Sequence, residues 1–302
     1  MSLHKPIKFI RFWRRYGEDY LFLLPYTLIF LIFTVLPVVL SIGLSFTYFN
    51  VFETPHFTGI DNYIKLFFND STFTLALKNT LLISLITGPV GYMLCLMLAW
   101  LVNEFPPRLR AFITLLFYAP SISGGVFMIW QLILSNDAYG LLNGFLLNSN
   151  LIYEPIQWTS DERYMFGACV VLILWMSIGT SFLSFIAGFQ NVNRTLYEAG
   201  AVDGVRTRWQ EAWYITLPSI RPQLLFGAVM SITASFGVGD TISGIFGFPS
   251  TNYALHTLVH HLQDYGNIRF EMGYASAIAT VLFAIMIGAN KLVQHVLKKV
   301  GV

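Results

Sequence analysis

Residues 20–46 read YLFLLPYTLIFLIFTVLPVVLSIGLSF, an apolar run without a single charged side chain. A bilayer core about 30 Å thick needs about 20 apolar residues in a helix, and this run is longer than that. It is also too long for the apolar part of a signal peptide, and no small-residue cleavage site follows it. The run therefore predicts a helix that stays attached and crosses a membrane.

Five further apolar runs follow, so the chain is expected to cross the membrane six times. They are Leu75–Val102, Phe112–Leu134, Phe166–Phe189, Pro222–Gly239 and Met272–Ala289. The weakest is Pro222–Gly239, which is short and contains glycine. Runs of this length without a period of two are not barrel strands. The predicted fold class is an all-α integral membrane protein.

The composition of the whole chain agrees with this fold class. Of 302 residues, 55% are apolar and only 11% are charged, against roughly 25% charged residues in an average soluble domain. These values exclude a soluble globule of this size, a disordered chain and a disulfide scaffold. Cys95 and Cys169 lie within apolar runs and are interpreted as small core residues. The net charge of +2 gives no reason to expect a nucleic-acid partner.

The basic residues predict the orientation. One set of alternate segments holds fourteen of the eighteen Lys and Arg residues, and the other set holds only Lys65, Lys78, Arg163 and Arg269. Basic residues concentrate on the cytoplasmic side, so we expect both termini in the cytoplasm. Two termini on one side require an even number of spans, which supports counting the weak fifth one. The fourteen are Lys5, Lys8, Arg11, Arg14, Arg15, Arg108, Arg110, Arg194, Arg206, Arg208, Arg221, Lys291, Lys298 and Lys299.

Proline residues predict kinks in two of the spans. Pro25 and Pro37 lie in the first span, and Pro120 lies in the third, directly before the small-residue segment 121–125. Two interpretations of that segment stay open. It permits close packing of helices, or it forms the hinge of a gate.

The segment between the fourth and fifth spans, residues 193–218, reads NRTLYEAGAVDGVRTRWQEAWYITLP. It predicts two short helices that break at Gly204, the first capped by Thr195 with Glu198 three residues later. Pro218 then starts or bends the fifth span. Helix connections usually take about 2–8 residues, so this longer segment favours a docking surface over a simple turn.

Within this segment, Glu198-Ala199-Gly200, Asp203-Gly204 and Ile215-Thr216-Leu217-Pro218 resemble the EAA loop of permease subunits of binding-protein-dependent ABC importers. Residues 57–63 and 273–277 are similar to supporting motifs of the carbohydrate branch, the first permease of the maltose and glycerol-3-phosphate type. Two features depart from the family pattern. Gly200 stands where a second Ala is common, and the ten residues between Gly204 and Ile215 are one more than usual.

The resemblance implies the type I ABC importer permease fold in a multi-pass protein of the plasma membrane. We expect residues 1–72 to form an N-terminal part with the first helix and outer loop. Residues 73–302 would form a five-helix core with the coupling loop at about 190–218. Residues expected to couple to the ATPase are Glu198, Ala199, Gly200, Asp203 and Gly204.

The implied partners are a second homologous permease, a homodimeric ABC ATPase, an extracytoplasmic sugar-binding protein and membrane lipid. The chain has no G-x-x-x-x-G-K-[ST] motif, so ATP and Mg²⁺ are expected in the ATPase, and this chain is expected to be no enzyme and to bind no cofactor. The expected substrate is a carbohydrate, in the form of an oligosaccharide. The alternatives are another solute such as glycerol-3-phosphate, an ion-coupled secondary transporter, or an intramembrane enzyme.

Hydroxyl side chains recur inside two of the spans and are candidates for a substrate path. Ser177, Thr180, Ser181 and Ser184 follow helical spacing in the fourth span, and Ser231 and Ser235 do so in the fifth. Hydrogen bonding between helices explains such residues equally well. The resemblance favours the path for part of the set, because the family's sugar lies midway across the membrane. The residues expected there are Met176, Ser177, Thr180, Ser231 and Ser235.

His256, His260 and His261 form an outer cluster, and the spacing of His256 and His260 at i and i+4 would suit a metal ion. The carboxylate partner that would complete a metal site is expected to be absent. We therefore expect no metal site.

Overall fold

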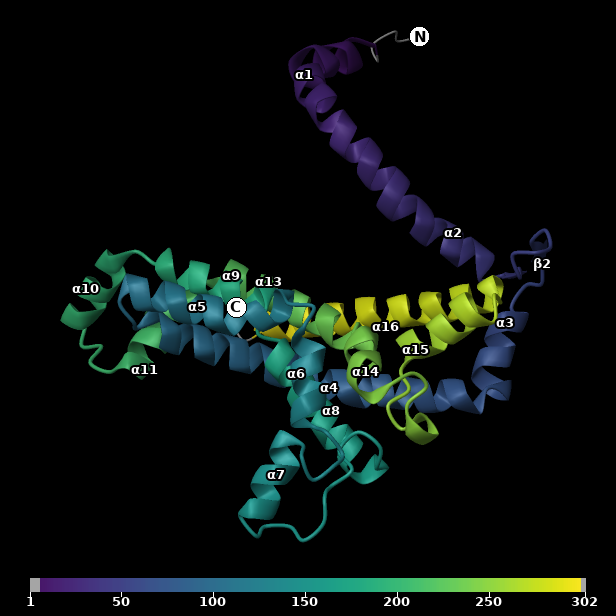
Figure 1. The fold of residues 1–302 in the computed structure, drawn as a ribbon. Helices are drawn as coiled ribbons and strands as arrows, with labels where there is room; N and C mark the ends of the chain where they lie inside the picture. The colour runs from purple at the N-terminus through teal and green to yellow at the C-terminus, as the bar shows by residue number, and fades with distance from the viewer. Residues whose placement is uncertain (1–5, 300–302) are drawn as a thin grey trace.

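The computed structural model describes the backbone of residues 6–299 and the side chains of residues 16–299. Lys5 and both chain ends lie outside these ranges. Within them one two-stranded ribbon holds the strands, and the other regular elements are helices joined by loops and turns. In Figure 1 the long helices run roughly side by side, with α10 and α11 at one end and α3, α15 and β2 at the other.

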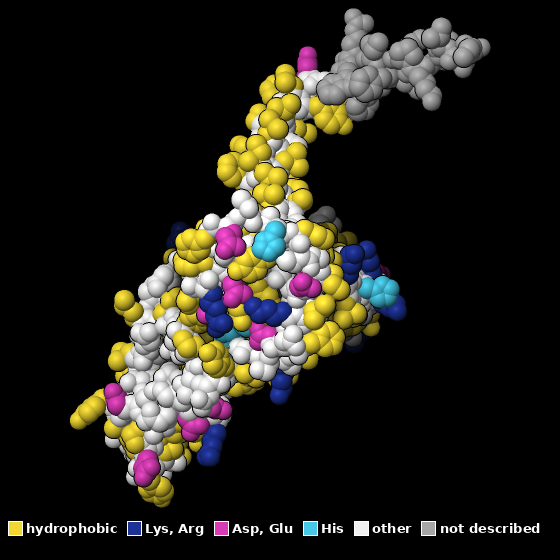
Figure 2. Space-filling view, turned by 90° about the vertical axis from the view of Figure 1, so that its right-hand side faces the viewer, with side chains coloured by type: hydrophobic (Ala, Val, Ile, Leu, Met, Phe, Trp, Pro, Cys, Tyr) yellow, Lys and Arg dark blue, Asp and Glu magenta, His cyan; other side chains and the backbone are white. Residues whose placement is uncertain are grey.

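Most of the first span stands away from this bundle, and only its C-terminal part, residues 36–44, packs against the last helix (Figure 1). The first span comprises α1 (Pro6–Phe30), a π-helical turn (Leu31–Val35) and α2 (Leu36–Leu44). The π-helical turn ends two residues before Pro37, where a kink was expected, and such turns accommodate backbone groups that proline disturbs. None of the most apolar stretch of this span is buried within the chain, and apolar side chains cover it (Figure 2).

Four helical segments are each long and apolar enough to cross a membrane. They are residues 16–44, α4 (Ser71–Asn103), residues 162–190 and α16 (Met272–Lys299). The third of these comprises α8 (Glu162–Met176) and α9 (Thr180–Gln190), with an interruption at residues 177–179.

The remaining two spans are bent. α5 (Pro107–Ile122) meets α6 (Val126–Ile133) at 88°, across the Ser-Gly-Gly segment that follows Pro120, so the expected kink there is confirmed. Residues 208–219 meet α13 (Arg221–Phe236) at 82°. If each bent pair is one span, the described residues hold the six spans that the sequence predicts. The bend before α13 lies at Ile220, two residues beyond Pro218.

The shorter elements connect these spans. They are β1 (Thr47–Tyr48) paired antiparallel with β2 (His56–Phe57), α3 (Asp61–Ile64), a π-helical turn at Lys65–Asn69, α7 (Leu141–Asn148), α10 (Arg194–Val202), α11 (Arg208–Glu211), a π-helical turn at Ala212–Thr216, α12 (Leu217–Ser219), α14 (Gly239–Phe246), a 3₁₀ turn at Thr251–Tyr253, α15 (Leu258–Gln263) and a π-helical turn at Asp264–Ile268.

Small residues let α4, α9 and α13 approach closely in the centre of the bundle. Gly227 of α13 lies directly against the ring of Phe185, and Gly88 of α4 faces Ser235. Gly91 of α4 packs against Ser177 in the interruption between α8 and α9. Without a hydrophobic driving force between helices in lipid, such close backbone approach is a main source of packing energy. It also brings residues 176–181 beside α13.

We expect residue 150 to be extracytoplasmic and residue 205 cytoplasmic, because the fourteen-to-four division of basic residues orients the chain. Single cysteines at Asn150 and Val205 can be labelled with a membrane-impermeant thiol reagent in intact cells. The reagent should modify residue 150, and residue 205 only after the membrane is opened. Labelling in the opposite order would reverse the orientation. The buried Cys95 and Cys169 are first replaced by serine.

Candidate functional site

A cavity of about 260 Å³ lies between the end of α5, the interruption between α8 and α9, and α13 with α14. All five residues proposed from the sequence for the substrate path line it, namely Met176, Ser177, Thr180, Ser231 and Ser235. Thr87, Ser121, Ser181 and Thr241 contribute further hydroxyl groups. None of the lining residues, all of them within the described part of the chain, carries a charge. The cavity can therefore offer hydrogen bonds to a neutral polar molecule.

Some of the hydroxyl groups connect two helices, and others bond to a carbonyl of the preceding helical turn. Ser181 Oγ lies 3.0 Å from the carbonyl of Gly227, to which it donates, and 3.1 Å from Ser231 Oγ, so it joins α9 to α13. Ser177 and Ser235 donate to the carbonyls of Leu174 and Ile232 in their own helices, at 2.7 and 2.8 Å. A hydroxyl oxygen that donates its hydrogen in this way can still accept a hydrogen bond. Packing and ligand binding are thus compatible within one cavity.

Sequence reasoning did not single out Thr87, Ser121 or Thr241. Ser121 belongs to the small-residue segment after Pro120, which was considered only as a hinge or packing surface. Thr87 lies in the middle of an apolar span, and Thr241 follows the end of one. Only the tertiary packing brings these three residues to one cavity.

Residues 193–219 form the second candidate site, which we call the elbow. α10 begins after Asn193, whose Oδ1 accepts a hydrogen bond from the backbone N–H of Thr195 at 3.1 Å. The expected cap at Thr195 was therefore wrong by two residues. Gly204 has φ +93°, the left-handed conformation expected at the break. The second arm begins at α11 with a capping box between Thr207 and Gln210.

The two arms of the elbow pack against each other. Tyr197 Oη lies 2.9 Å from Thr216 Oγ1, and a Cβ at Gly200 would lie 2.5 Å from Cδ1 of Ile215. Gly200 is buried by this contact, so it faces the second arm of its own elbow. The other four coupling candidates, Glu198, Ala199, Asp203 and Gly204, are exposed and available to a partner.

The elbow has one residue more between Gly204 and Ile215 than the family pattern has. The second arm contains a π-helical turn at Ala212–Thr216, and such a turn holds one residue more than an α-helical turn. The extra residue can therefore be accommodated inside the second arm.

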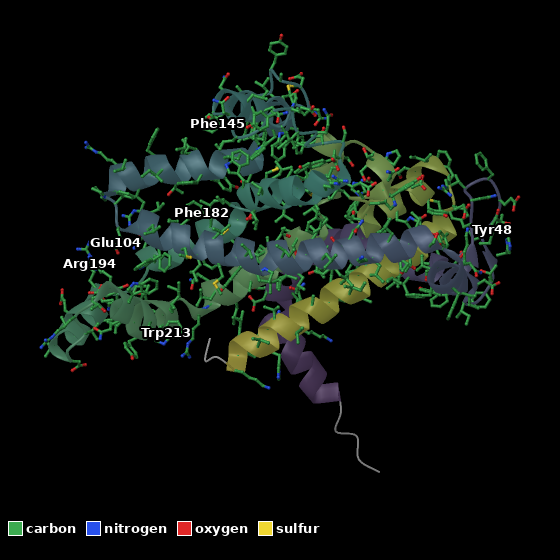
Figure 3. All side chains as sticks on the ribbon, turned by 90° about the horizontal axis from the view of Figure 1, so that it is seen from below. Tyr48, Glu104, Phe145, Phe182, Arg194 and Trp213 are labelled. Atoms are coloured by element: carbon green, nitrogen blue, oxygen red, sulfur yellow. The ribbon has the colours of Figure 1, made fainter. Side chains whose placement is uncertain are left out.

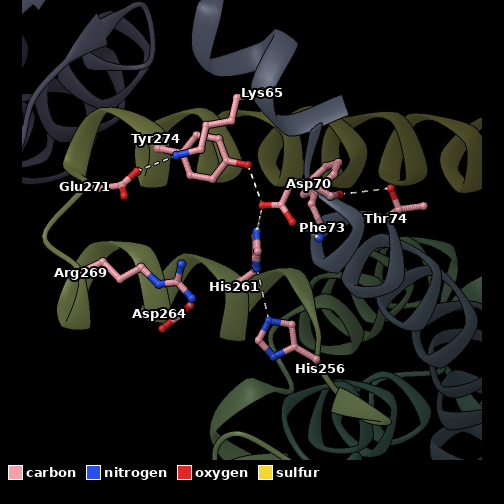
Figure 4. Close-up of polar contacts among 10 residues, drawn as sticks. All are labelled: Lys65, Asp70, Phe73, Thr74, His256, His261, Asp264, Arg269, Glu271 and Tyr274. Atoms are coloured by element: carbon pink, nitrogen blue, oxygen red, sulfur yellow. Dashed lines mark hydrogen bonds and ion pairs between the residues drawn. The ribbon is translucent and has the colours of Figure 1, made fainter. Parts of the chain in front are cut away.

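The three outer histidines are buried, and two of them, His261 and His256, form a chain of contacts with a carboxylate that is distant in the sequence (Figure 4). Asp70 caps α4 by accepting from the backbone N–H of Phe73 at 2.9 Å. Its other oxygen lies 2.9 Å from His261 Nε2 and 2.8 Å from the hydroxyl of Tyr274. His261 Nδ1 lies 3.3 Å from His256 Nε2. The expectation that no carboxylate accompanies the histidines was wrong, since Asp70 provides one.

This arrangement ties together α4, α15 and α16 at the end of the bundle opposite the elbow. Among the described residues, no group of three or more His, Cys, Asp or Glu side chains could hold a metal ion. Burial lowers the pKa of His256 to about 3 and also lowers the pKa of His260 and of His261. Burial alone would raise the pKa of Asp70, but the hydrogen bonds from Phe73 and Tyr274 outweigh it, and that pKa is lowered.

Acidification from about pH 7.5 to about pH 4.5 is expected to lower the thermal unfolding temperature of the protein. In the unfolded chain the histidines bind protons below about pH 6.5, whereas the folded chain keeps them neutral. Unfolding therefore takes up protons, and the free energy of unfolding decreases as the pH is lowered. Asp70 adds a loss in the same direction only below its ordinary pKa of 3.8. Unfolding followed by intrinsic fluorescence in lipid nanodiscs measures the effect.

The control for this prediction is a pair of substitutions. His256→Gln should flatten the pH dependence, while His295→Gln, at an exposed position of α16, should leave it unchanged. Equal slopes in the wild type and His256→Gln would show that the buried cluster does not cause the dependence.

A bundle of membrane-crossing helices with a helical elbow at one end and an uncharged cavity bearing hydroxyl groups at its centre has the architecture of a membrane permease. The chain belongs to the family of binding-protein-dependent transport system inner membrane components, whose sequence model matches residues 91–302. It is therefore a multi-pass protein of the plasma membrane.

Curated relatives place the chain among ABC transporter permeases. It is 33% identical over 273 residues to the probable ABC transporter permease protein YesP of Bacillus subtilis. This alignment covers 88% of this chain and 86% of YesP. It is 31% identical over 278 residues to the arabinooligosaccharides transport system permease protein AraP of the same species, covering 91% of this chain and 87% of AraP.

A solved structure agrees with the fold. A chain of a bacterial ABC transporter involved in the import of the acidic polysaccharide alginate superimposes with a TM-score of 0.75 at 25% identity. The superposition covers 95% of this chain and 99% of the other chain.

Proposed function

We propose that this chain forms half of the translocation path of an ATP-driven importer for a neutral carbohydrate, an oligosaccharide. The observation that carries the proposal is the uncharged, hydroxyl-lined cavity in a chain that also bears the exposed elbow. Sugars are recognised through many hydroxyl groups, and serine and threonine can both donate to and accept from them. Permeases for arabinooligosaccharides and lactose are among the relatives.

The cavity disfavours the two main alternatives. A glycerol-3-phosphate permease is also among the relatives, with 27% identity over 77% of this chain. Phosphate is usually held by Arg or Lys, and neither lines the cavity. A proton-coupled transporter needs ionisable groups along its path, and the lining residues include none with a carboxyl, amino or imidazole group.

The remaining parts of the importer are proposed from the surfaces that this chain leaves exposed. A homodimeric ABC ATPase that binds ATP and Mg²⁺ would contact the elbow through Glu198, Ala199, Asp203 and Gly204. A second homologous permease would complete the cavity, and the first span would face this permease and lipid. An extracytoplasmic sugar-binding protein would deliver the substrate.

Uptake into proteoliposomes tests the substrate class. The complete complex, with binding protein and ATP, should accumulate a labelled arabino- or galacto-oligosaccharide, and unlabelled glycerol-3-phosphate in excess should not compete. Uptake of glycerol-3-phosphate in place of the oligosaccharide would contradict the proposal. Uptake that requires an ion gradient and proceeds without ATP would contradict the ABC mechanism.

A further inference from the structure

Two cavities meet at Arg110 and Gln190, at the end of the bundle that carries the elbow. The first, about 400 Å³, lies between the ends of α4, α5 and α9 and the elbow, and Arg110, Arg194 and Arg208 line it. The second, about 410 Å³, follows the groove between α5 and α9. Glu104 and Arg194, which both line the first cavity, are labelled at this end in Figure 3. A polar cavity therefore continues into a groove along two membrane helices.

The polar cavity has more positive than negative charge. Arg208 is balanced by Glu104 at 3.3 Å and Glu211 at 2.8 Å. Arg110 donates to the neutral Oδ1 of Asn103 at 2.7 Å. Among residues 16–299, neither Arg110 nor Arg194 has an acidic partner within 4.0 Å. Guanidinium groups bind phosphate in a forked geometry, so two arginines are available to an anion.

The groove is mainly apolar and lies where the hydrocarbon of a bilayer would begin. Its lining includes Ala111, Leu115, Tyr118, Leu183 and Ile186. At the level of the polar cavity, Trp100 and Trp209 lie with ring centroids 5.2 Å apart, and Trp213 and Tyr214 nearby are exposed. Tryptophan and tyrosine concentrate at the head-group level of membranes. The polar cavity is thus at the depth of lipid head groups.

We infer that the two cavities together bind one anionic phospholipid of the leaflet on the elbow side. The phosphate of its head group would lie between Arg110 and Arg194, and one acyl chain would follow the groove between α5 and α9. Basic pockets between membrane helices on the cytoplasmic side are suited to such head groups. Because Arg110 belongs to α5 and Arg194 to α10, the head group connects the membrane bundle to the elbow.

Lipid retention by the complete complex with its second permease and ATPase tests this inference. The complex is reconstituted in nanodiscs of phosphatidylcholine with phosphatidylglycerol as the minor lipid, and the retained phosphatidylglycerol is counted by native mass spectrometry. Arg110→Gln with Arg194→Gln should weaken retention by about tenfold or more, since two charge-assisted contacts are lost. Arg108→Gln with Arg221→Gln removes the same charge outside both cavities and should retain phosphatidylglycerol as the wild type does.

A second pair of variants tests the groove without changing charge. Ala111→Phe fills the groove and should also lower retention, whereas Leu116→Phe, exposed on the same helix but outside the groove, should not. Glycerol phosphate in solution should fail to displace the phosphatidylglycerol.

Three results would overturn the inference. These are wild-type retention by the double arginine variant, displacement by soluble glycerol phosphate, and a cross-link from a photoreactive residue at position 115 to the second permease in place of lipid. Retention is measured without any sugar, so the outcome does not depend on the proposed substrate.

Discussion

Replacing Gly204 by leucine is expected to abolish most of the ATP hydrolysis that the binding protein stimulates, while the six spans remain folded. Gly204 has φ +93°. A residue with a Cβ destabilises the folded chain by about 1–3 kcal/mol in such a conformation. No atom lies within 4 Å of the position of that Cβ, so the cost is backbone strain and not a clash. The exposed elbow can relieve the strain by changing the angle between its arms.

The measurement is co-purification of the ATPase together with stimulated hydrolysis in nanodiscs. We expect the stimulated rate of ATP hydrolysis to fall about tenfold, because a strain of about 1.4 kcal/mol shifts the coupling equilibrium by a factor of ten. Gly288→Leu is the matched control, since it also has open space around its Cβ but has no positive φ. If Gly204→Leu keeps both stoichiometric ATPase and full stimulation, the elbow is a simple connector.

Filling the central cavity with Thr180→Trp or Ser231→Trp is expected to reduce carbohydrate uptake by at least about tenfold. Both positions line a cavity of only about 260 Å³, and an indole is among the largest side chains. The complex should still assemble and hydrolyse ATP at its basal rate, because neither residue belongs to the elbow. Thr180 gives the cleaner test, since Ser231 also contacts Ser181.

Uptake into proteoliposomes and basal hydrolysis are measured on the same preparations. Thr233→Trp is the matched control, because Thr233 lies on α13 near Ser231 but is exposed and outside the cavity. Normal uptake by Thr180→Trp and Ser231→Trp would mean that the hydroxyl groups serve helix packing alone. Ser177→Trp is less informative, since a Cβ on the neighbouring Gly91 would already lie 2.9 Å from Ser177 Oγ.

Local features of the sequence predicted the fold class and the positions of the spans. The length of an apolar run decides whether a helix can cross a bilayer, and Pro120 with the glycines after it indicated the bend between α5 and α6. The break at Gly204 was also apparent, because a glycine after a short amphipathic run is typical of a helix end. All of these properties depend on residues that are close in the chain.

The direction in which each side chain points was decided only by the tertiary structure. Gly200 was expected to face the ATPase, but it packs against Ile215. The histidines were expected to lack a carboxylate, but Asp70 contacts His261 although the two residues are 191 positions apart in the chain. The polar cavity at Arg110 and Arg194 likewise combines segments from three membrane helices, α4, α5 and α9, and the elbow.

The sequence by itself thus determined that this protein is an all-helical membrane protein with a two-helix elbow, because helix length, apolarity and breaks are local properties. It also identified five positions that the structure brings to one cavity, four with a hydroxyl side chain and the fifth Met176. The tertiary structure alone decided which residues complete that cavity, which elbow residues are exposed and where charges meet. The physical reason is that contacts between distant segments depend on how helices cross and bend, and no local pattern encodes those angles.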